Sequence, residues 1–302
     1  MAEMTSPDKL FARMEDLDLL TPDKTFIGCF YGTSGSGKTT TSAALAQQLT
    51  GTGRILHLDS SDGYVSLQNF PGLTSGMTRL RITNYADLYG VATAMEKHHP
   101  KFKDFDVVIL DEFSSMADGT LDEVVTEKTG DVTSDIDWTY YRSSAQRMIA
   151  VLNKLHAIEG LHVIIVAHER KDLLRPKVYV TSPGFSPKFR DSVMQLMHFV
   201  GNCSRVVEGS EAKTTYKFMI QAQLSKLVMA KSRIPGIPTY LDPATTIDVI
   251  QNWVYSGQIE VDTSSAEEYV DPAEDMLPGE GVTSADLVVE DDDEPALVEP
   301  VE

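Results

Sequence analysis

The sequence feature that most constrains the fold is the stretch from Thr25 to Leu49, TFIGCFYGTSGSGKTTTSAALAQQL. An apolar run over residues 26–31 has the length and composition of a buried strand. The pattern G-x-x-x-x-G-K-[ST] follows at once, and then an alanine- and leucine-rich run whose apolar spacing predicts a helix. Strand, glycine-rich loop and helix in this order are the context in which the pattern binds phosphate, so we expect a nucleotide-binding α/β domain.

The chemistry of phosphate binding explains the residue types in this loop. Glycines let the backbone turn its N–H groups toward phosphate oxygens, and the N-terminus of the next helix adds its dipole. Lys38 places a positive charge on the β- and γ-phosphates, and Thr39 offers its hydroxyl to Mg²⁺. We therefore expect ATP and Mg²⁺ as cofactors. The expected phosphate loop consists of Gly32, Thr33, Ser34, Gly35, Ser36, Gly37, Lys38, Thr39 and Thr40.

The acidity of the chain is concentrated at its C-terminal end. The 302 residues carry a net charge of −19. Residues 260–302 hold 16 Asp and Glu and no Lys or Arg, which leaves a net charge of −3 for residues 1–259. A segment of this composition cannot bury enough apolar surface to fold, so residues 259–302 are expected to be a disordered acidic tail. Such a tail can compete with DNA for basic surface, dock a single-strand-binding or recombination partner protein, or act only as a solubilising segment.

The N-terminal segment and the cysteines suggest a protein of the cytoplasm. Residues 6–20 predict a short amphipathic helix, so residues 1–23 are expected to form a helical arm. This arm packs on its own domain or docks on a neighbouring subunit. Two cysteines do not make a disulfide framework. Since no apolar run has the length of a signal peptide or a membrane span, we expect a cytoplasmic protein without membrane contact.

Strands and helices alternate along the body of the chain at the spacing of a parallel sheet. The expected elements cover residues 55–59, 80–85, 86–98, 105–111, 137–158, 161–166, 204–208, 215–221 and 245–254. The long helix at residues 137–158 is expected because apolar residues, beginning at Trp138 and Tyr141, recur there at helical spacing. The sequence thus predicts one domain over residues 24–258, with a mostly parallel central sheet and helices on both faces.

A strand that ends in two acids supplies the expected second half of the nucleotide site. The run FDVVILD ends in Asp111, and Glu112 follows it. A hard cation selects carboxylate oxygen, so Asp111 is expected to hold Mg²⁺ through water. Glu112 is expected to polarise the attacking water as general base, while Asp59, at the end of the neighbouring strand, competes for that role.

Two further features are candidates for coupling the nucleotide to a nucleic acid. His168 closes the strand at residues 161–166, at the edge where ligands of open α/β sheets bind, and is a candidate sensor of the γ-phosphate. Residues 170–190 are interpreted as a loop that mixes cations with the rings of Tyr179, Phe185 and Phe189. This combination suits binding of single strands regardless of base. The candidate DNA-binding residues are Arg170, Lys171, Arg175, Lys177, Lys188 and Arg190.

Lys231 and Arg233 form a late pair of cations. They are separated by one residue on an expected strand, so both point to the same face. That geometry can deliver both cations to a phosphate, including one across a subunit boundary in the manner of an arginine finger. The alternative is a solvated strand end.

The order of these motifs resembles that of RecA-like ATPases. The phosphate loop, the LHLD and VVILDE strands, the helix near Trp138, the VIIVAH strand and the Lys-x-Arg pair span about residues 24–256. The chain looks most similar to phage-encoded ATPases of the single-strand annealing and recombination group, and more distantly to RadA and DnaB-type ring helicases. In RecA the catalytic glutamate ends the second strand, where this chain has Asp59, so the resemblance leaves the base open between Asp59 and Glu112.

The resemblance implies a ring or filament of identical subunits with ATP at their interfaces, where Lys231 and Arg233 act in trans. The expected activity is a DNA-stimulated ATPase of phage-type recombination, annealing or replication on single-stranded DNA, in the host cytoplasm if a phage encodes it. A nucleotide-switched loader or scaffold, a helicase or packaging motor, and a P-loop kinase with a basic lid stay open as alternatives. The sequence holds neither an LSGGQ-like transporter motif nor the guanine-reading N/T-K-x-D motif.

Overall fold

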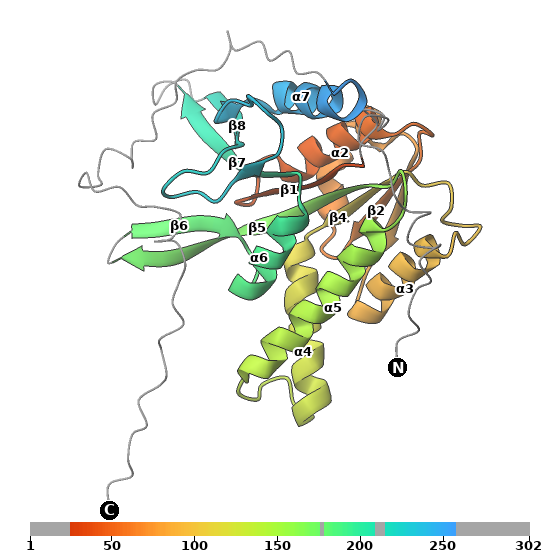
Figure 1. The fold of residues 1–302 in the computed structure, drawn as a ribbon, viewed down its shortest axis with the longest axis vertical. Helices are drawn as coiled ribbons and strands as arrows, with labels where there is room; N and C mark the ends of the chain where they lie inside the picture. The colour runs from red at the N-terminus through yellow and green to blue at the C-terminus, as the bar shows by residue number, and fades with distance from the viewer. Residues whose placement is uncertain (1–24, 176–177, 209–214, 258–302) are drawn as a thin grey trace, which may run out of the picture.

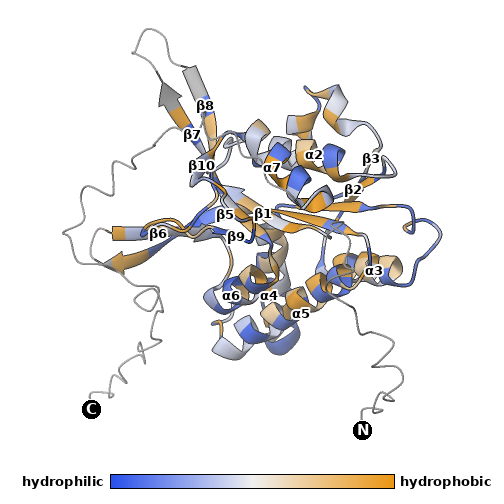
Figure 2. Cartoon of the chain, turned by 45° about the horizontal axis from the view of Figure 1, so that its top comes forward, coloured by the Kyte–Doolittle hydropathy of each residue, from blue (hydrophilic) through white to orange (hydrophobic). Residues whose placement is uncertain are grey.

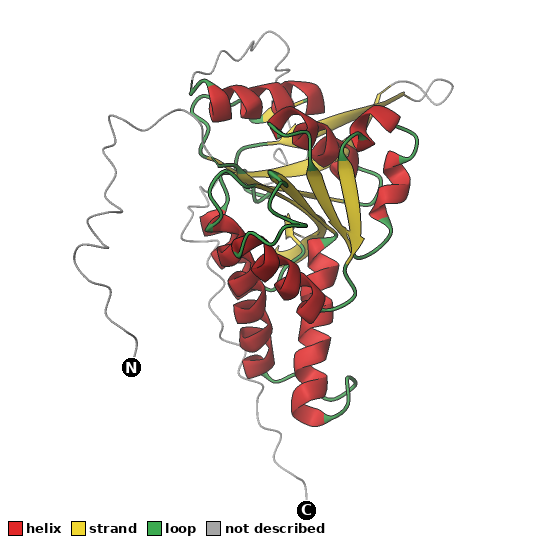
Figure 3. Cartoon of the chain, turned by 90° about the vertical axis from the view of Figure 1, so that its right-hand side faces the viewer, coloured by secondary structure: helices red, strands yellow, loops and turns green. Residues whose placement is uncertain are grey.

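A mostly parallel sheet with helices on both faces forms the centre of the protein (Figures 1 and 3). This computed structural model describes residues 25–175, 178–208 and 215–257. The expected N-terminal arm at residues 1–23 and the expected acidic tail at residues 259–302 lie outside the described residues.

Six strands form the parallel part of the sheet, in the order β7-β1-β5-β4-β2-β3. They are β1 (Ile27–Gly32), β2 (Ile55–Asp59), β3 (Met77–Arg81), β4 (Val107–Asp111), β5 (His162–Arg175) and β7 (Phe199–Glu208). Because β1 lies between β5 and β7, the loop that follows it leaves from the middle of the carboxyl edge, where ligands of such sheets bind.

Antiparallel strands extend this sheet on two sides. Strand β6 pairs with β5, strands β8 and β9 pair with β7, and β10 pairs with β8. Their bounds are β6 (Val178–Pro183), β8 (Thr215–Gln221), β9 (Lys231–Ser232) and β10 (Tyr240–Leu241).

The two faces of the sheet are covered by different helices. Side chains alternate along β1, so Phe30 packs in a core with α2 and α7, whereas Cys29 and Tyr31 pack in a core with α3, α4, α5 and α6. Figure 2 shows the hydrophobic residues concentrated along the central strands. The helices are α2 (Lys38–Leu49), α3 (Tyr85–Glu96), α4 (Phe113–Thr129), α5 (Trp138–His156), α6 (Pro187–Leu196) and α7 (Pro243–Tyr255).

Two short 3₁₀ helices, η2 (Gly63–Leu67) and η3 (Pro71–Thr74), connect β2 to β3. The third strand lies at residues 77–81 rather than at the predicted 80–85, and the next helix begins at Tyr85, one residue before its predicted start. The side chain of Asn84 caps that helix by accepting a hydrogen bond from the N–H of Asp87 at 2.8 Å. Helix α4 was not predicted, since its Ser, Thr and Gly residues weaken the helical pattern.

The interpretation of residues 170–190 as a loop is wrong. Strand β5 continues to Arg175 and forms an antiparallel hairpin with β6, and α6 follows at Pro187. The β-branched residues Val178, Val180 and Thr181 favour this hairpin. The segment therefore presents its side chains from strands and a helix in defined directions.

Candidate active site

The glycine-rich loop between β1 and α2 forms one wall of the site. Gly32, Gly35 and Gly37 have φ angles of 154°, 75° and 84°, in the region that side chains disfavour. Gly37 is the N-cap of α2 and provides no side-chain cap, so the first N–H groups of the helix can bind phosphate oxygens. The ammonium of Lys38 donates to the carbonyl oxygen of Thr33 at 2.8 Å, which keeps it against the loop.

A cavity of about 740 Å³ opens beside the loop. This volume lies within the roughly 300–1,000 Å³ of small-molecule sites. Phosphate-loop residues and Glu112 line one part of it, and Phe70, Leu73, Phe218 and Ile247 line another. The rings of Phe70 and Phe218 remain exposed at 50% and 38% and can stack on a nucleobase. Sequence reasoning missed both rings, because isolated aromatic residues outside a motif carry no signal.

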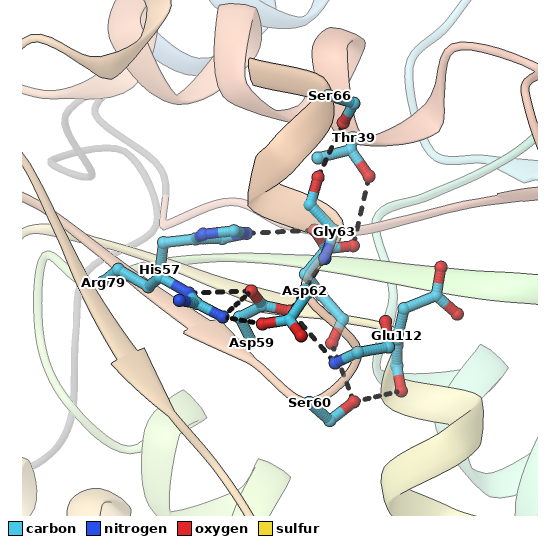
Figure 4. Close-up of polar contacts among 11 residues, drawn as sticks. Thr39, His57, Asp59, Ser60, Asp62, Gly63, Ser66, Arg79 and Glu112 are labelled. Carbon is cyan, nitrogen blue, oxygen red and sulfur yellow. Dashed lines mark hydrogen bonds and ion pairs between the residues drawn. The ribbon is translucent and has the colours of Figure 1, made fainter. Parts of the chain in front are cut away.

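Thr39 and Asp111 meet next to this cavity. The hydroxyl of Thr39, labelled in Figure 4, donates to Oδ1 of Asp111 at 3.2 Å. Asp111 is fully buried at the end of β4. Hydroxyl and carboxylate oxygens are the ligands that Mg²⁺ prefers, so these two residues fit the cation. Bound there, Mg²⁺ would neutralise charge on the phosphates. Among the described residues, no group of three or more His, Cys, Asp or Glu side chains is placed to hold a metal ion.

Glu112 is placed for proton transfer. It has a φ of 61°, a conformation that non-glycine residues seldom adopt, and this turns the chain from β4 directly into α4. Its carboxylate lines the nucleotide cavity and pairs with the ring of His168. Burial raises the pKa of Glu112 above its usual range, and the neighbouring His168 partly opposes that shift. A carboxyl group with a raised pKa beside a nucleotide cavity is a candidate general base.

This shift predicts the pH dependence of ATP turnover. A raised pKa means that Glu112 takes up a proton at a higher pH than an ordinary glutamate, and the protonated form cannot accept a proton from water. Turnover should therefore fall as the pH drops through that pKa and recover above it. Measuring kcat across the weakly acidic to neutral range tests this. A wild-type rate that is flat over this range would contradict the assignment.

Asp59, the competing candidate, has its oxygens engaged elsewhere. It is fully buried, and its Oδ1 accepts hydrogen bonds from the N–H groups of Ser61 and Gly63, both at 3.1 Å. Its Oδ2 accepts from Nε of Arg79 at 2.9 Å (Figure 4). Burial raises the pKa of Asp59, but these hydrogen bonds and the nearby His57 outweigh it and leave the pKa below its usual value. The geometry favours a structural role for Asp59 and leaves Glu112 as the better placed base.

His168 connects the site with the hairpin and α6. Its backbone N–H donates to Oγ of Ser114 at 3.0 Å, and its carbonyl accepts from the N–H of Gly184 at 2.8 Å. Phe113, next to Glu112, packs against Phe185 with ring centroids 5.9 Å apart. These contacts join the residues around Glu112 to the segment that links the hairpin to α6.

Lys231 and Arg233 lie away from the phosphate loop of their own chain. Strand β9 pairs with the start of β7 at Phe199 and Val200, toward the amino edge of the sheet. Both cations point to one place, as predicted. Nζ of Lys231 donates to the carbonyl oxygen of Met194 at 2.6 Å, and Nη2 of Arg233 donates to that of Gln195 at 2.7 Å. These two side chains hold the C-terminal turn of α6.

The candidate DNA-binding cations have different surroundings. Arg170, Lys171 and Lys188 are exposed, although Arg170 pairs with Asp172 at 2.6 Å and Lys171 with Glu169 at 3.7 Å. Lys177 and the side chain of Arg175 lie outside the described residues.

The interpretation of Arg190 as a DNA ligand needs correction. Arg190 is only 8% exposed and donates to Asp172 at 2.6 Å and to Oγ of Ser182 at 2.8 Å. Phe185 and Phe189 are each 2% exposed, so their rings are core residues rather than stacking platforms. Tyr179, by contrast, is exposed.

A small groove joins the starts of α5 and α6. We call it the α5–α6 groove. It has a volume of about 120 Å³, and its lining includes Trp138, Tyr141, Arg142, Arg170, Ser186 and Lys188. Trp138, the first residue of α5, is 54% exposed. Helices α4 and α5 extend beyond the sheet (Figure 1). The first turn of α5 therefore lies outside the helix layer that covers the sheet.

The fold and this site define a P-loop ATPase of the RecA/AAA type. Residues 25–234 match the family described as AAA domain, and the chain belongs to that family. No curated protein matches the sequence.

Two solved structures are similar to the chain. The flagellar accessory protein FlaH from Methanocaldococcus jannaschii is 9% identical, with a TM-score of 0.40 over 71% of this chain and 83% of that one. An ATPase from the type III secretion system of pathogenic bacteria is 13% identical, with a TM-score of 0.40 over 59% of this chain and 51% of that one. In the described part of the chain, no helix combines the length and apolarity needed to cross a bilayer.

Proposed function

We propose that this ATPase binds single-stranded DNA and couples the binding to hydrolysis, in phage-type recombination, annealing or replication. The observation that carries the proposal is the position of the α5–α6 groove. Its cations Arg142, Arg170 and Lys188 lie beside the rings of Trp138 and Tyr141. Cations for the phosphates and flat rings for the bases are the combination that binds single strands without sequence preference.

The groove adjoins the catalytic residues. A second cavity, of about 330 Å³, contains His168 and Ser114 and shares Tyr141, Arg170 and Ser186 with the groove. His168 pairs with Glu112 and is two residues before Arg170 on β5. Single-stranded DNA bound in the groove therefore acts through β5 on Glu112, the general base. This short path explains how DNA would stimulate turnover.

The same proposal includes assembly into a homo-oligomer. Lys231 and Arg233 lie away from their own phosphate loop, so a role at ATP requires a neighbouring subunit. In such an assembly, they exchange the carbonyl oxygens of α6 for a phosphate of the neighbour.

The decisive experiment is ATP turnover with and without single-stranded DNA, with Lys38→Ala as the blank. Stimulation by DNA supports the proposal. An ATP turnover rate that DNA does not change would contradict the proposal and favour a nucleotide-switched loader or a kinase.

Neutralising the groove should weaken DNA binding and its salt dependence. In the triple variant Arg142→Ala, Arg170→Ala, Lys188→Ala, each lost phosphate contact reduces the salt slope of log K by about 0.7. We therefore expect a slope smaller by about 2, measured by fluorescence anisotropy of a labelled oligonucleotide over a salt series. The matched control neutralises the exposed lysines of the α3–β4 connection: Lys97, Lys101 and Lys103. If both triple variants lower the slope equally, the DNA site is not the groove.

A further inference from the structure

A buried histidine contacts the aspartate of the magnesium site. The side chain of His57, in the middle of β2, is 1% exposed, and its Nε2 lies 3.0 Å from Oδ2 of Asp111. Thr39 donates to the other oxygen, Oδ1, of the same carboxylate. Figure 4 labels His57 and Thr39 and shows a dashed line from each of their side chains. The two oxygens of Asp111 thus have different partners, one on each side.

The sheet register brings this histidine to the aspartate. Strands β2 and β4 are parallel neighbours in which His57 is opposite Ile109, and Asp59 is opposite Asp111. Residues two apart on a strand share a face, so His57 and Asp111 point to the same side of the sheet. Pattern reasoning did not single out His57, because a lone histidine inside an apolar strand is usually structural.

The hydrogen-bond partners of the two ring nitrogens show which nitrogen of His57 donates to Asp111. Nδ1 is buried and has no hydrogen-bond partner among the described residues. An ionised carboxylate only accepts hydrogen bonds, so Nε2 must be the donor to Asp111. The tautomer with its proton on Nδ1 would bury an unpaired N–H and also place a lone pair against the carboxylate. Nε2 therefore carries a proton and donates it to Asp111.

Gly63 confines the same oxygen of Asp111. A Cβ at Gly63 would lie 2.6 Å from Oδ2, so no larger residue fits there without movement. The N–H of Gly63 is held by Asp59 at 3.1 Å, which fixes the backbone of η2 at this point. Oδ2 is thus packed between His57 and Gly63, while Oδ1 faces Thr39.

We propose that His57 is a positioning residue for the magnesium site. Its Nε2–H holds Oδ2 of Asp111, so that Oδ1 stays beside the hydroxyl of Thr39, where the cation of the bound nucleotide is expected. Partners behind a metal-binding carboxylate orient it and reduce the cost of ordering it, and their loss typically lowers metal affinity about 10–100-fold. This role does not depend on DNA, so all measurements are made without DNA.

Two substitutions separate positioning from packing. His57→Leu keeps a similar volume and removes the donor, whereas His57→Gln keeps an N–H donor of similar reach. The readout is binding of a fluorescent ADP analogue during titration with Mg²⁺, which requires no turnover. For His57→Leu we expect the half-saturating Mg²⁺ concentration to rise about 10–100-fold. His57→Gln should shift it much less, and analogue binding in EDTA should be the same in all three proteins.

The wild-type protein provides a test that does not require the leucine variant to fold. ¹⁵N NMR of the full chain labelled at histidine should show the proton of His57 on Nε2, with assignment by the signal lost in His57→Gln. A proton on Nδ1 would overturn the proposal. A folded His57→Leu protein with an unchanged Mg²⁺ titration would also overturn it, even if its melting temperature falls, because packing alone would then explain the residue.

Discussion

Replacement of Lys38 by alanine is expected to reduce ATP turnover by at least about 10²–10³-fold, the usual loss when one preorganised electrostatic contact is removed. Lys38 is 5% exposed and held against the loop by Thr33, so its ammonium lies where the β- and γ-phosphates bind. No other lysine or arginine lines the nucleotide cavity in the described part of the chain. The measurement is steady-state phosphate release at saturating ATP.

The fold should tolerate this substitution. The ammonium of Lys38 donates to the nearby carbonyl oxygen of Thr33, so the loss of this hydrogen bond leaves the sheet and the helix layers intact. A circular dichroism spectrum and melting temperature close to those of the wild type are the expected controls, and Lys97→Ala, an exposed lysine just after α3, is the matched variant. If Lys38→Ala turns over ATP as fast as the wild type, the assignment of the nucleotide site to this loop is wrong.

The second large effect is expected from Glu112→Gln. Loss of a general base typically costs about 10²–10⁴-fold in turnover, whereas the isosteric amide still fills the space beside His168. Nucleotide binding should be retained, since the contacts of Lys38, Thr39 and Asp111 are unchanged. Single-turnover hydrolysis together with equilibrium binding of the ADP analogue separates the two effects. The acidic limb of the pH profile should disappear in this variant.

Asp59→Asn is the matched control for the base assignment. The buried carboxylate of Asp59 accepts from two part-buried backbone N–H groups and from the partly exposed Arg79, so its replacement weakens all three hydrogen bonds. We expect a loss of about 1–3 kcal/mol in the free energy of unfolding. Its lowered pKa means that this contribution is present at neutral pH and is lost as the pH falls through that pKa. A stable Asp59→Asn protein without hydrolysis, beside an active Glu112→Gln protein, would assign the base to Asp59.

Local sequence patterns were sufficient for the elements closest to the nucleotide. The strand before the phosphate loop, the strands that end in Asp59 and Asp111, and the start of the strand that leads to His168 were all predicted. Buried parallel strands are continuous apolar runs, and the loop motif carries its own constraints, so both are visible within a few residues. The fold class follows from their alternation with helices.

The hairpin of β5 and β6 was missed because its cations and rings also fit a solvated loop. Whether a given cation is available depends on long-range partners. Lys188 is exposed, whereas Arg190, two residues later, turns inward to Asp172 and Ser182. Helical spacing predicted the helix that begins near Trp138, but it did not show that Trp138 itself is 54% exposed.

The sequence by itself determined that this chain has a phosphate loop, a neighbouring acidic strand end and a parallel sheet, since each depends on residues adjacent in the chain. Only the tertiary structure showed that Asp59 bonds to Arg79 whereas Glu112 faces the nucleotide cavity. It also brought His57 next to Asp111, and the start of α5 next to the start of α6. These contacts join residues far apart in sequence. Strand register and helix packing produce them, and no local pattern encodes either.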